Sequence, residues 1–147
     1  MTNRALLIGL MGFAMAGDLR AVIQIKISVA DIYQTSAQVI VGKVEAKNEA
    51  NGVIDVMVGQ TVKGPAVGEK VRVQINKPQE AFGAAEIGSA VVIFVGKARG
   101  DQAATASVHM GDQWLYAVAL ANAAVLSWRV EQRRVDLDKA FPGRSGA

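Results

Sequence analysis

The sequence predicts a mainly β protein organised around a five-stranded Greek-key barrel, with an additional C-terminal β-hairpin, short helices and a cleavable N-terminal signal helix. Four segments rich in Val and Ile, at residues 38–47, 53–60, 70–76 and 89–97, follow one another closely. The stretches between them carry Asn-Gly, Gly-Pro or Lys-Pro, which end strands and form turns. Within most of the segments apolar and polar residues alternate with period two, as in strands that bury one face.

The first 16 residues have the pattern of a secretory signal peptide. A polar head with one cation, Arg4, is followed by an uncharged apolar run over residues 5–16 that ends in Ala14-Met15-Ala16, a small-x-small cleavage pattern. The run is shorter than the roughly 20 residues that span a bilayer, so we expect no permanent membrane span. The alternative is a buried first helix. The signal reading predicts an exported protein, periplasmic or extracellular after cleavage.

The length of the chain predicts a single domain after the signal peptide. The 147 residues accommodate a signal peptide at 1–16, one β domain at 17–132 and an irregular tail at 133–147. The chain contains no cysteine, so the domain must rest on its hydrophobic core and not on disulfides. The formal charge is +3 and becomes +2 if Arg4 leaves with the signal peptide, which makes basicity a weak guide to partners.

The N-terminal half of the domain has specific local signals. Residues 21–28 alternate as a half-buried strand, and Ser28 with Asp31 has the form of a capping box that starts a short helix over residues 29–35, or else a turn. Asn51-Gly52 predicts a hairpin between the first two barrel strands. Residues 78–85 predict a short helix that plugs the barrel. Residues 91–95 are apolar on both faces, as expected for a strand covered from both sides.

The C-terminal half predicts three more strand-like segments, at residues 103–110, 113–120 and 125–131. Trp114 and Tyr116 share one face of the middle segment. Trp128 follows in the next segment and is expected to pair with Trp114 in an aromatic core.

The order VIVGKV, IDVMV, QTVKGPAVGEKVRVQI and GSAVVIFV over residues 39–94 resembles a known family. It is similar to the netrin-module-like, or TIMP-like, OB-fold domains of uncharacterised exported bacterial proteins. The continuation from Met110-Gly111-Asp112-Gln113-Trp114 to Phe141-Pro142-Gly143-Arg144 resembles the same group. The resemblance implies an OB-like barrel in an exported protein. The animal members inhibit metalloproteinases through an N-terminal cysteine, and that mechanism does not transfer to a chain without cysteine.

No pattern in the sequence indicates catalysis, a cofactor or a metal. His109 is the only histidine, no serine lies in G-x-S-x-G, and the carboxylates lack calcium-loop spacing. We therefore interpret His109 as structural. The segment GPAVGEK at residues 64–70 lacks the spacing of a phosphate-binding loop and precedes a strand, so it is read as a turn.

These observations predict a non-enzymatic exported binding module that engages an unidentified protein or envelope component. The alternative is an OB domain that binds single-stranded nucleic acid or another anionic polymer, with a ligand face of Lys43, Lys47, Lys70 and Arg72. Interleaved Glu45 and Glu69 make nucleic acid the less favoured partner. A third hypothesis is protease inhibition through loops near residues 17–22.

Overall fold

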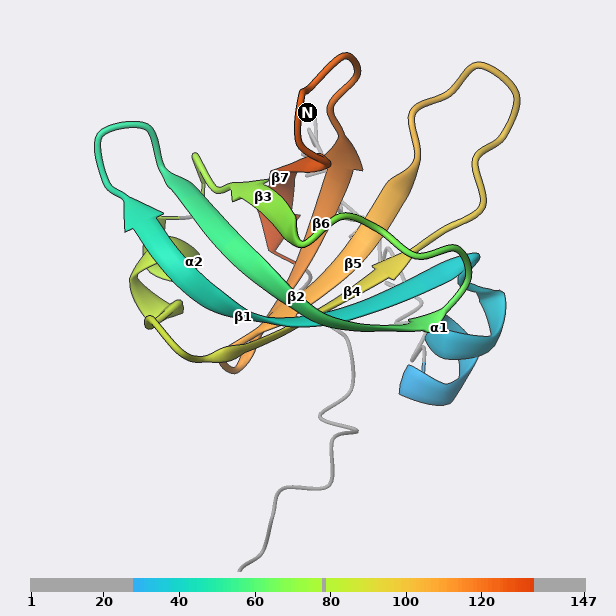
Figure 1. The fold of residues 1–147 in the computed structure, drawn as a ribbon, viewed down its shortest axis with the longest axis horizontal. Coiled ribbons are helices and arrows are strands. Elements are labelled where there is room, and N and C mark those ends of the chain that lie inside the picture. The colour runs from blue at the N-terminus through green and yellow to red at the C-terminus, as the bar shows by residue number, and fades with distance from the viewer. Residues whose placement is uncertain (1–27, 78, 134–147) are drawn as a thin grey trace, which may run out of the picture.

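The computed structural model describes residues 28–77 and 79–133 (Figure 1). The expected signal peptide, the strand at residues 21–27 and the tail from residue 134 onward lie outside the described residues. The elements, in chain order, are α1 (Val29–Thr35), β1 (Gln38–Asn48), β2 (Val53–Lys63), β3 (Lys70–Gln74), α2 (Gln79–Ala84), β4 (Ala90–Val95), β5 (Thr105–Met110), β6 (Gln113–Ala119) and β7 (Ser127–Arg133).

The strands form one closed barrel in the order β1-β2-β3-β7-β6-β5-β4 (Figure 1). All neighbours are antiparallel except β3 and β7, which run parallel through Arg72–Ser127, Val73–Trp128 and Gln74–Arg129. The prediction of a mainly β barrel is therefore confirmed. The predicted number of five strands is wrong, because the barrel has seven. The C-terminal strands do not form an added hairpin: β5, β6 and β7 are part of the wall, and β7 closes it.

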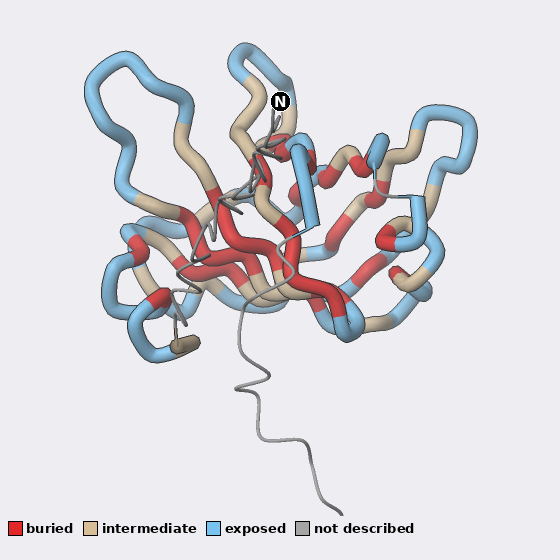
Figure 2. The backbone as a smooth tube through the Cα atoms, turned by 180° about the vertical axis from the view of Figure 1, so that it is seen from behind, coloured by how far each residue is buried: buried red, intermediate tan, exposed pale blue. Residues whose placement is uncertain are grey.

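The barrel interior is filled by alternate residues of every strand. Ile54 and Val56 of β2, Val71 and Val73 of β3 and Leu115 of β6 are at most 1% exposed. Helix α2 adds Ala81 to the same core, and the partly buried Phe82 packs against it. The expected short helix thus forms between β3 and β4 and covers part of the core. Figure 2 shows the buried segments along the strands and the exposed ones in the loops.

A second, smaller apolar cluster lies on the outside of the barrel, beneath α1. Ile32 packs there with Val39, Phe94 and Trp114. The outer face of β4 is thereby covered, which confirms the expectation drawn from its apolar residues. The expected Trp114–Trp128 core pair is wrong, because Trp114 belongs to this outer cluster and Trp128 to the barrel core. Their strands are adjacent, but the two side chains leave the wall on opposite sides.

The start of α1 follows the expected capping box. Ser28 Oγ accepts a hydrogen bond from the Asp31 backbone N–H at 3.1 Å, and the Asp31 carboxylate accepts one from the Ser28 backbone N–H at 3.4 Å. Both bonds satisfy backbone donors that a helix start leaves without partners. The helix alternative was therefore the correct one for residues 29–35.

The long β1–β2 ribbon is irregular, and this irregularity determines where its side chains point. The register shifts between Val39 and Ile40, between Val41 and Gly42, and between Val44 and Ala46. The last shift leaves Glu45 as an extra residue on β1. Such bulges bend the strand and reverse the alternation beyond them. The ribbon ends in the predicted hairpin, where Gly52 has φ +62°.

Candidate functional site

The described surface offers three candidates: the charged outer side of β1–β3 and two small pockets. The first is the outer charged face, which consists of Lys43, Glu45, Asp55, Met57, Lys70 and Arg72. Cross-strand pairing places Lys43, Met57 and Lys70 in one row, and Asp55 opposite Arg72. Met57 is 50% exposed at the centre of this row. Three of the four predicted ligand residues, Lys43, Lys70 and Arg72, therefore lie together.

Two of these cations are paired with carboxylates. Lys70 Nζ lies 2.7 Å from Glu45 Oε2, and Arg72 Nε lies 2.8 Å from Asp55 Oδ1. The hydrogen bond that Lys70 donates to Glu45 raises the pKa of Lys70, and the one that Arg72 donates to Asp55 raises the pKa of Arg72. Three cations and two carboxylates leave the face with a net charge of only +1. A polyanion would meet a surface whose positive charge is largely compensated.

Lys47 is separated from the other predicted ligand residues. The bulge at Glu45 shifts the register, so Lys47 pairs across the ribbon with the inward-facing Ile54. Its Nζ lies 4.6 Å from the centre of the Phe82 ring on α2, in a cation–π contact. The alternation of residues predicted Lys43, Glu45 and Lys47 on one face of the strand. That prediction is wrong for Lys47, because the bulge at Glu45 interrupts the alternation.

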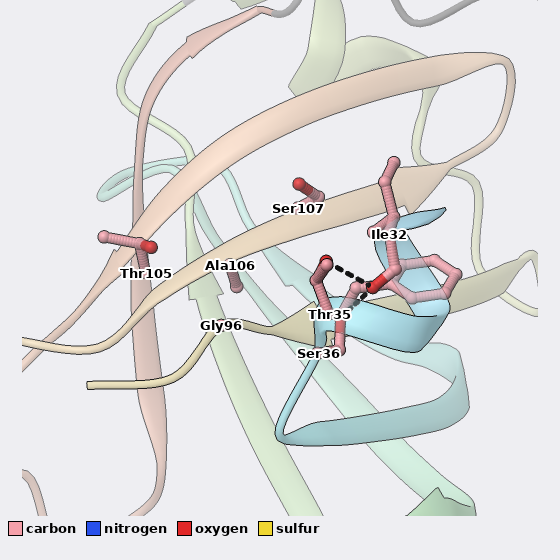
Figure 3. Close-up of a pocket in the computed structure, with 8 residues that line it drawn as sticks. Ile32, Thr35, Ser36, Gly96, Thr105, Ala106 and Ser107 are labelled. Atoms are coloured by element: carbon pink, nitrogen blue, oxygen red, sulfur yellow. Dashed lines mark hydrogen bonds between the residues drawn. The ribbon is translucent and has the colours of Figure 1, made fainter. Parts of the chain in front are cut away.

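The second candidate is a pocket between α1 and the adjacent ends of β4 and β5, with a volume of about 180 Å³ (Figure 3). We call it the hydroxyl pocket. It is lined by Ile32, Thr35, Ser36, Phe94, Gly96, Thr105, Ala106 and Ser107. Four of these residues carry hydroxyl groups, and none carries a charge. Sequence reasoning did not identify this site.

The third candidate is a pocket of about 260 Å³ beside the β1–β2 hairpin. Glu49, Asn51 and Gly52 of the hairpin line it together with Asn76 and Phe82. All of its polar side chains are solvent-exposed. We find no buried polar group there that would require a ligand.

His109 lies on the outside of the wall, opposite Trp114 on β6. The two rings are 4.8 Å apart, with their planes inclined by 58°. Burial lowers the pKa of His109, and the nearby Asp112 carboxylate acts in the opposite direction. His109 thus packs against an aromatic ring, and its interpretation as structural stays a prediction.

Within residues 28–77 and 79–133 there is no cluster of three or more His, Cys, Asp or Glu that could hold a metal ion. No helix in the same part of the chain has the length and apolar character needed to cross a membrane. Comparison with known proteins gave no match: no family model fits the sequence, and no curated protein or solved structure is detectably similar.

Proposed function

We propose that the protein is an exported, non-enzymatic OB-like module that binds another protein or an envelope component through the outer charged face. The observation that carries this proposal is Met57, a half-exposed apolar side chain within a ring of charges that are mostly paired. Protein interfaces combine an apolar centre with a polar rim and are enriched in Met and Arg. A large apolar side chain held in the middle of a sheet face meets that description.

The chain path supports the OB-like part of the proposal. β1, β2 and β3 form a meander, α2 lies between the third and fourth strands, and the third strand pairs with the last one. This path is compatible with an OB-like barrel in which β5 and β6 are added between β4 and β7. The resemblance of residues 39–94 to netrin-module-like domains stays a prediction from the sequence, and the signal pattern at residues 1–16 is the reason for proposing export.

Paired charges favour a protein partner over a nucleic acid. A single-strand binder needs uncompensated cations along the backbone and aromatic rings on which bases stack. On the outer charged face Lys70 and Arg72 are paired, and the face contains no aromatic residue. The ring of Phe82 lies outside this face and is in contact with the Lys47 ammonium group.

Site-specific cross-linking tests the proposal. A photo-reactive amino acid at position 57 should capture a defined envelope or secreted partner from the producing cell. The same amino acid at position 87 should not capture it, because Ile87 is 69% exposed but lies outside the outer charged face. The change Met57→Glu should weaken the captured complex by about tenfold or more, and Ile87→Glu should leave it unchanged.

Three results would contradict the proposal. Equal capture from positions 57 and 87 would show that the face is not specific. Tight binding of a single-stranded oligonucleotide that weakens steeply with salt would favour the anionic-polymer alternative. A hydrolase or transferase activity that is lost in His109→Ala would show that the protein is an enzyme.

A further inference from the structure

The hydroxyl pocket is lined by a serine whose hydroxyl makes no hydrogen bond with a described residue. Ser107 is only 7% exposed and lines the pocket, yet its side chain makes no hydrogen bond with any described residue. Thr105, two residues earlier on β5, also lines the pocket and likewise makes no side-chain hydrogen bond in the described structure. Among the described residues, the fully buried side-chain atoms without a partner are Gln113 Oε1 and Trp128 Nε1, so the Ser107 hydroxyl is open to water or to a bound molecule in the pocket. Both groups retain a proton to donate to a bound molecule.

The opposite wall, at the C-terminal end of α1, presents hydroxyls of the complementary kind. Ser36 Oγ donates to the Ile32 carbonyl oxygen at 2.5 Å. Thr35 Oγ1 lies 2.8 Å from the Asp31 carbonyl oxygen and 3.3 Å from that of Ile32. Figure 3 shows Thr35 and Ser36 both directed to the Ile32 carbonyl. Because their protons are used in this way, these two hydroxyls have only acceptor capacity left for a ligand.

The remaining lining is neutral and partly apolar. Ile32, Phe94 and Ala106 provide carbon surface, and none of the eight lining residues is ionisable. A charged ligand would lose its hydration without gaining a counter-charge. The volume of about 180 Å³ corresponds to about six water molecules at roughly 30 Å³ each. This is room for one small unit and not for an oligomer.

The geometry points to a binding site for one neutral polyol unit, such as a single sugar ring, in the hydroxyl pocket. Each hydroxyl of a polyol donates and accepts, so it can satisfy the donors of Thr105 and Ser107 and the acceptors of Thr35 and Ser36 together. Its C–H surface packs against Ile32 and Phe94. This site lies between α1, β4 and β5, whereas the outer charged face lies on β1, β2 and β3, so the two binding functions are independent.

Chemical-shift mapping on the labelled protein tests the assignment, with D-glucose as the neutral probe and glucose 6-phosphate as its charged counterpart. We expect millimolar D-glucose to shift the backbone amides of Gly96, Ser107 and Ser36 in a saturable way. Ser107→Ala should raise the dissociation constant for D-glucose about fivefold, which corresponds to the loss of one hydrogen bond. Ser89→Ala is the matched control, because Ser89 Oγ donates to Glu86 O outside the pocket.

Thr105→Val provides a second variant of nearly unchanged shape that removes the other donor. A weaker affinity in both Ser107→Ala and Thr105→Val, with Ser89→Ala unchanged, supports the site. The assignment is overturned if D-glucose causes no saturable shift, if the variants bind it as well as the parent does, or if glucose 6-phosphate binds more tightly. The first of these outcomes would identify the pocket as a water-filled recess.

Discussion

Lys63 on β2 secures the C-terminal end of α1 through Tyr33. Its Nζ donates to the Tyr33 carbonyl oxygen at 2.8 Å and to that of Gln34 at 3.0 Å, and lies 5.1 Å from the centre of the Tyr33 ring. The last carbonyls of a helix have no intrahelical partners and carry its negative dipole end. One ammonium group thus satisfies two carbonyls and ties α1 to the barrel wall.

We predict that Lys63→Met lowers the free energy of unfolding by about 1 kcal/mol, the usual value of a cation at a helix C-terminus. Urea denaturation followed by circular dichroism measures the change. Lys97→Met, at an exposed lysine in the β4–β5 connection, is the control and should stay within about 0.5 kcal/mol of the parent. An equal loss in both variants would show that charge alone, and not the contact with α1, is responsible.

Gly42 allows β1 to cross close to β2, and Gly42→Ala should be strongly destabilising. A Cβ at this position would lie 2.8 Å from Val56 Cγ1 and closer still to the Met57 carbonyl oxygen. Forcing extra volume into a packed wall typically costs about 1–3 kcal/mol, and here one of the opposing atoms belongs to the backbone. The measurement is the midpoint of thermal or urea unfolding.

Gly59→Ala is the matched control for Gly42→Ala. Gly59 also lies in the β1–β2 ribbon, but a Cβ there would meet only the Val41 carbonyl oxygen at 3.6 Å, an ordinary contact. We expect this variant to unfold close to the parent. If it loses as much stability as Gly42→Ala, the cause is a general intolerance of side chains in the ribbon and not the close approach at Gly42.

The unfolding free energy should also depend on pH through His109. Because burial lowers the pKa of His109 below its ordinary value of 6.5 in the folded state, the unfolded chain takes up a proton first as pH falls. This contribution to stability is full above pH 6.5 and is lost as pH falls through 6.5 toward the folded-state pKa. Denaturation curves recorded above the range of carboxylate titration, about pH 4.3, isolate the effect.

His109→Gln should flatten this pH dependence, since it removes the titrating group and keeps a polar side chain at the position. Asp112→Asn should steepen it, because the Asp112 carboxylate acts to raise the pKa of His109. The same slope in parent and His109→Gln would mean that another group is responsible.

Local signals in the sequence predicted the elements well but not their partners. The capping box at Ser28 and Asp31 and the Asn51-Gly52 hairpin depend on residues close in sequence, and both form as predicted. The pairing of β3 with β7 joins residues more than fifty positions apart, as in Val73 and Trp128. Alternation within a strand says which residues share a face but not which strand lies alongside, so the strand number was wrong.

The candidate sites show the same limit. Met57 could have been found, because alternation places it with Asp55 on the side of the strand opposite Ile54 and Val56. Lys47 was assigned to the wrong side of the ribbon because a bulge has no clear sequence signal. Ser107 alternates with buried residues like any outward side chain, and its place in a pocket shared with Ile32 and Thr35 of α1 depends on tertiary packing.

Trp128 provides a test of the barrel core itself. It is 1% exposed, and its indole Nε1 has no hydrogen-bond partner among the described residues. Trp128→Ala should cost about 3–5 kcal/mol through the cavity that it leaves. Trp128→Phe also loses ring volume. In the parent, however, the buried indole N–H without a partner costs about 1–3 kcal/mol, and Trp128→Phe removes that cost. We therefore expect the Phe variant to retain most of the parent's stability.

Urea unfolding monitored by far-ultraviolet circular dichroism compares the two variants without relying on tryptophan emission. The expected order is parent close to Trp128→Phe, with Trp128→Ala far below both. If Trp128→Phe falls to the level of Trp128→Ala, the indole N–H makes a stabilising bond, for instance to an ordered water molecule. If Trp128→Ala is as stable as the parent, Trp128 does not fill the interior. The closure of the barrel by β3 and β7 would then be in question, because Trp128 stands opposite Val73 at that junction.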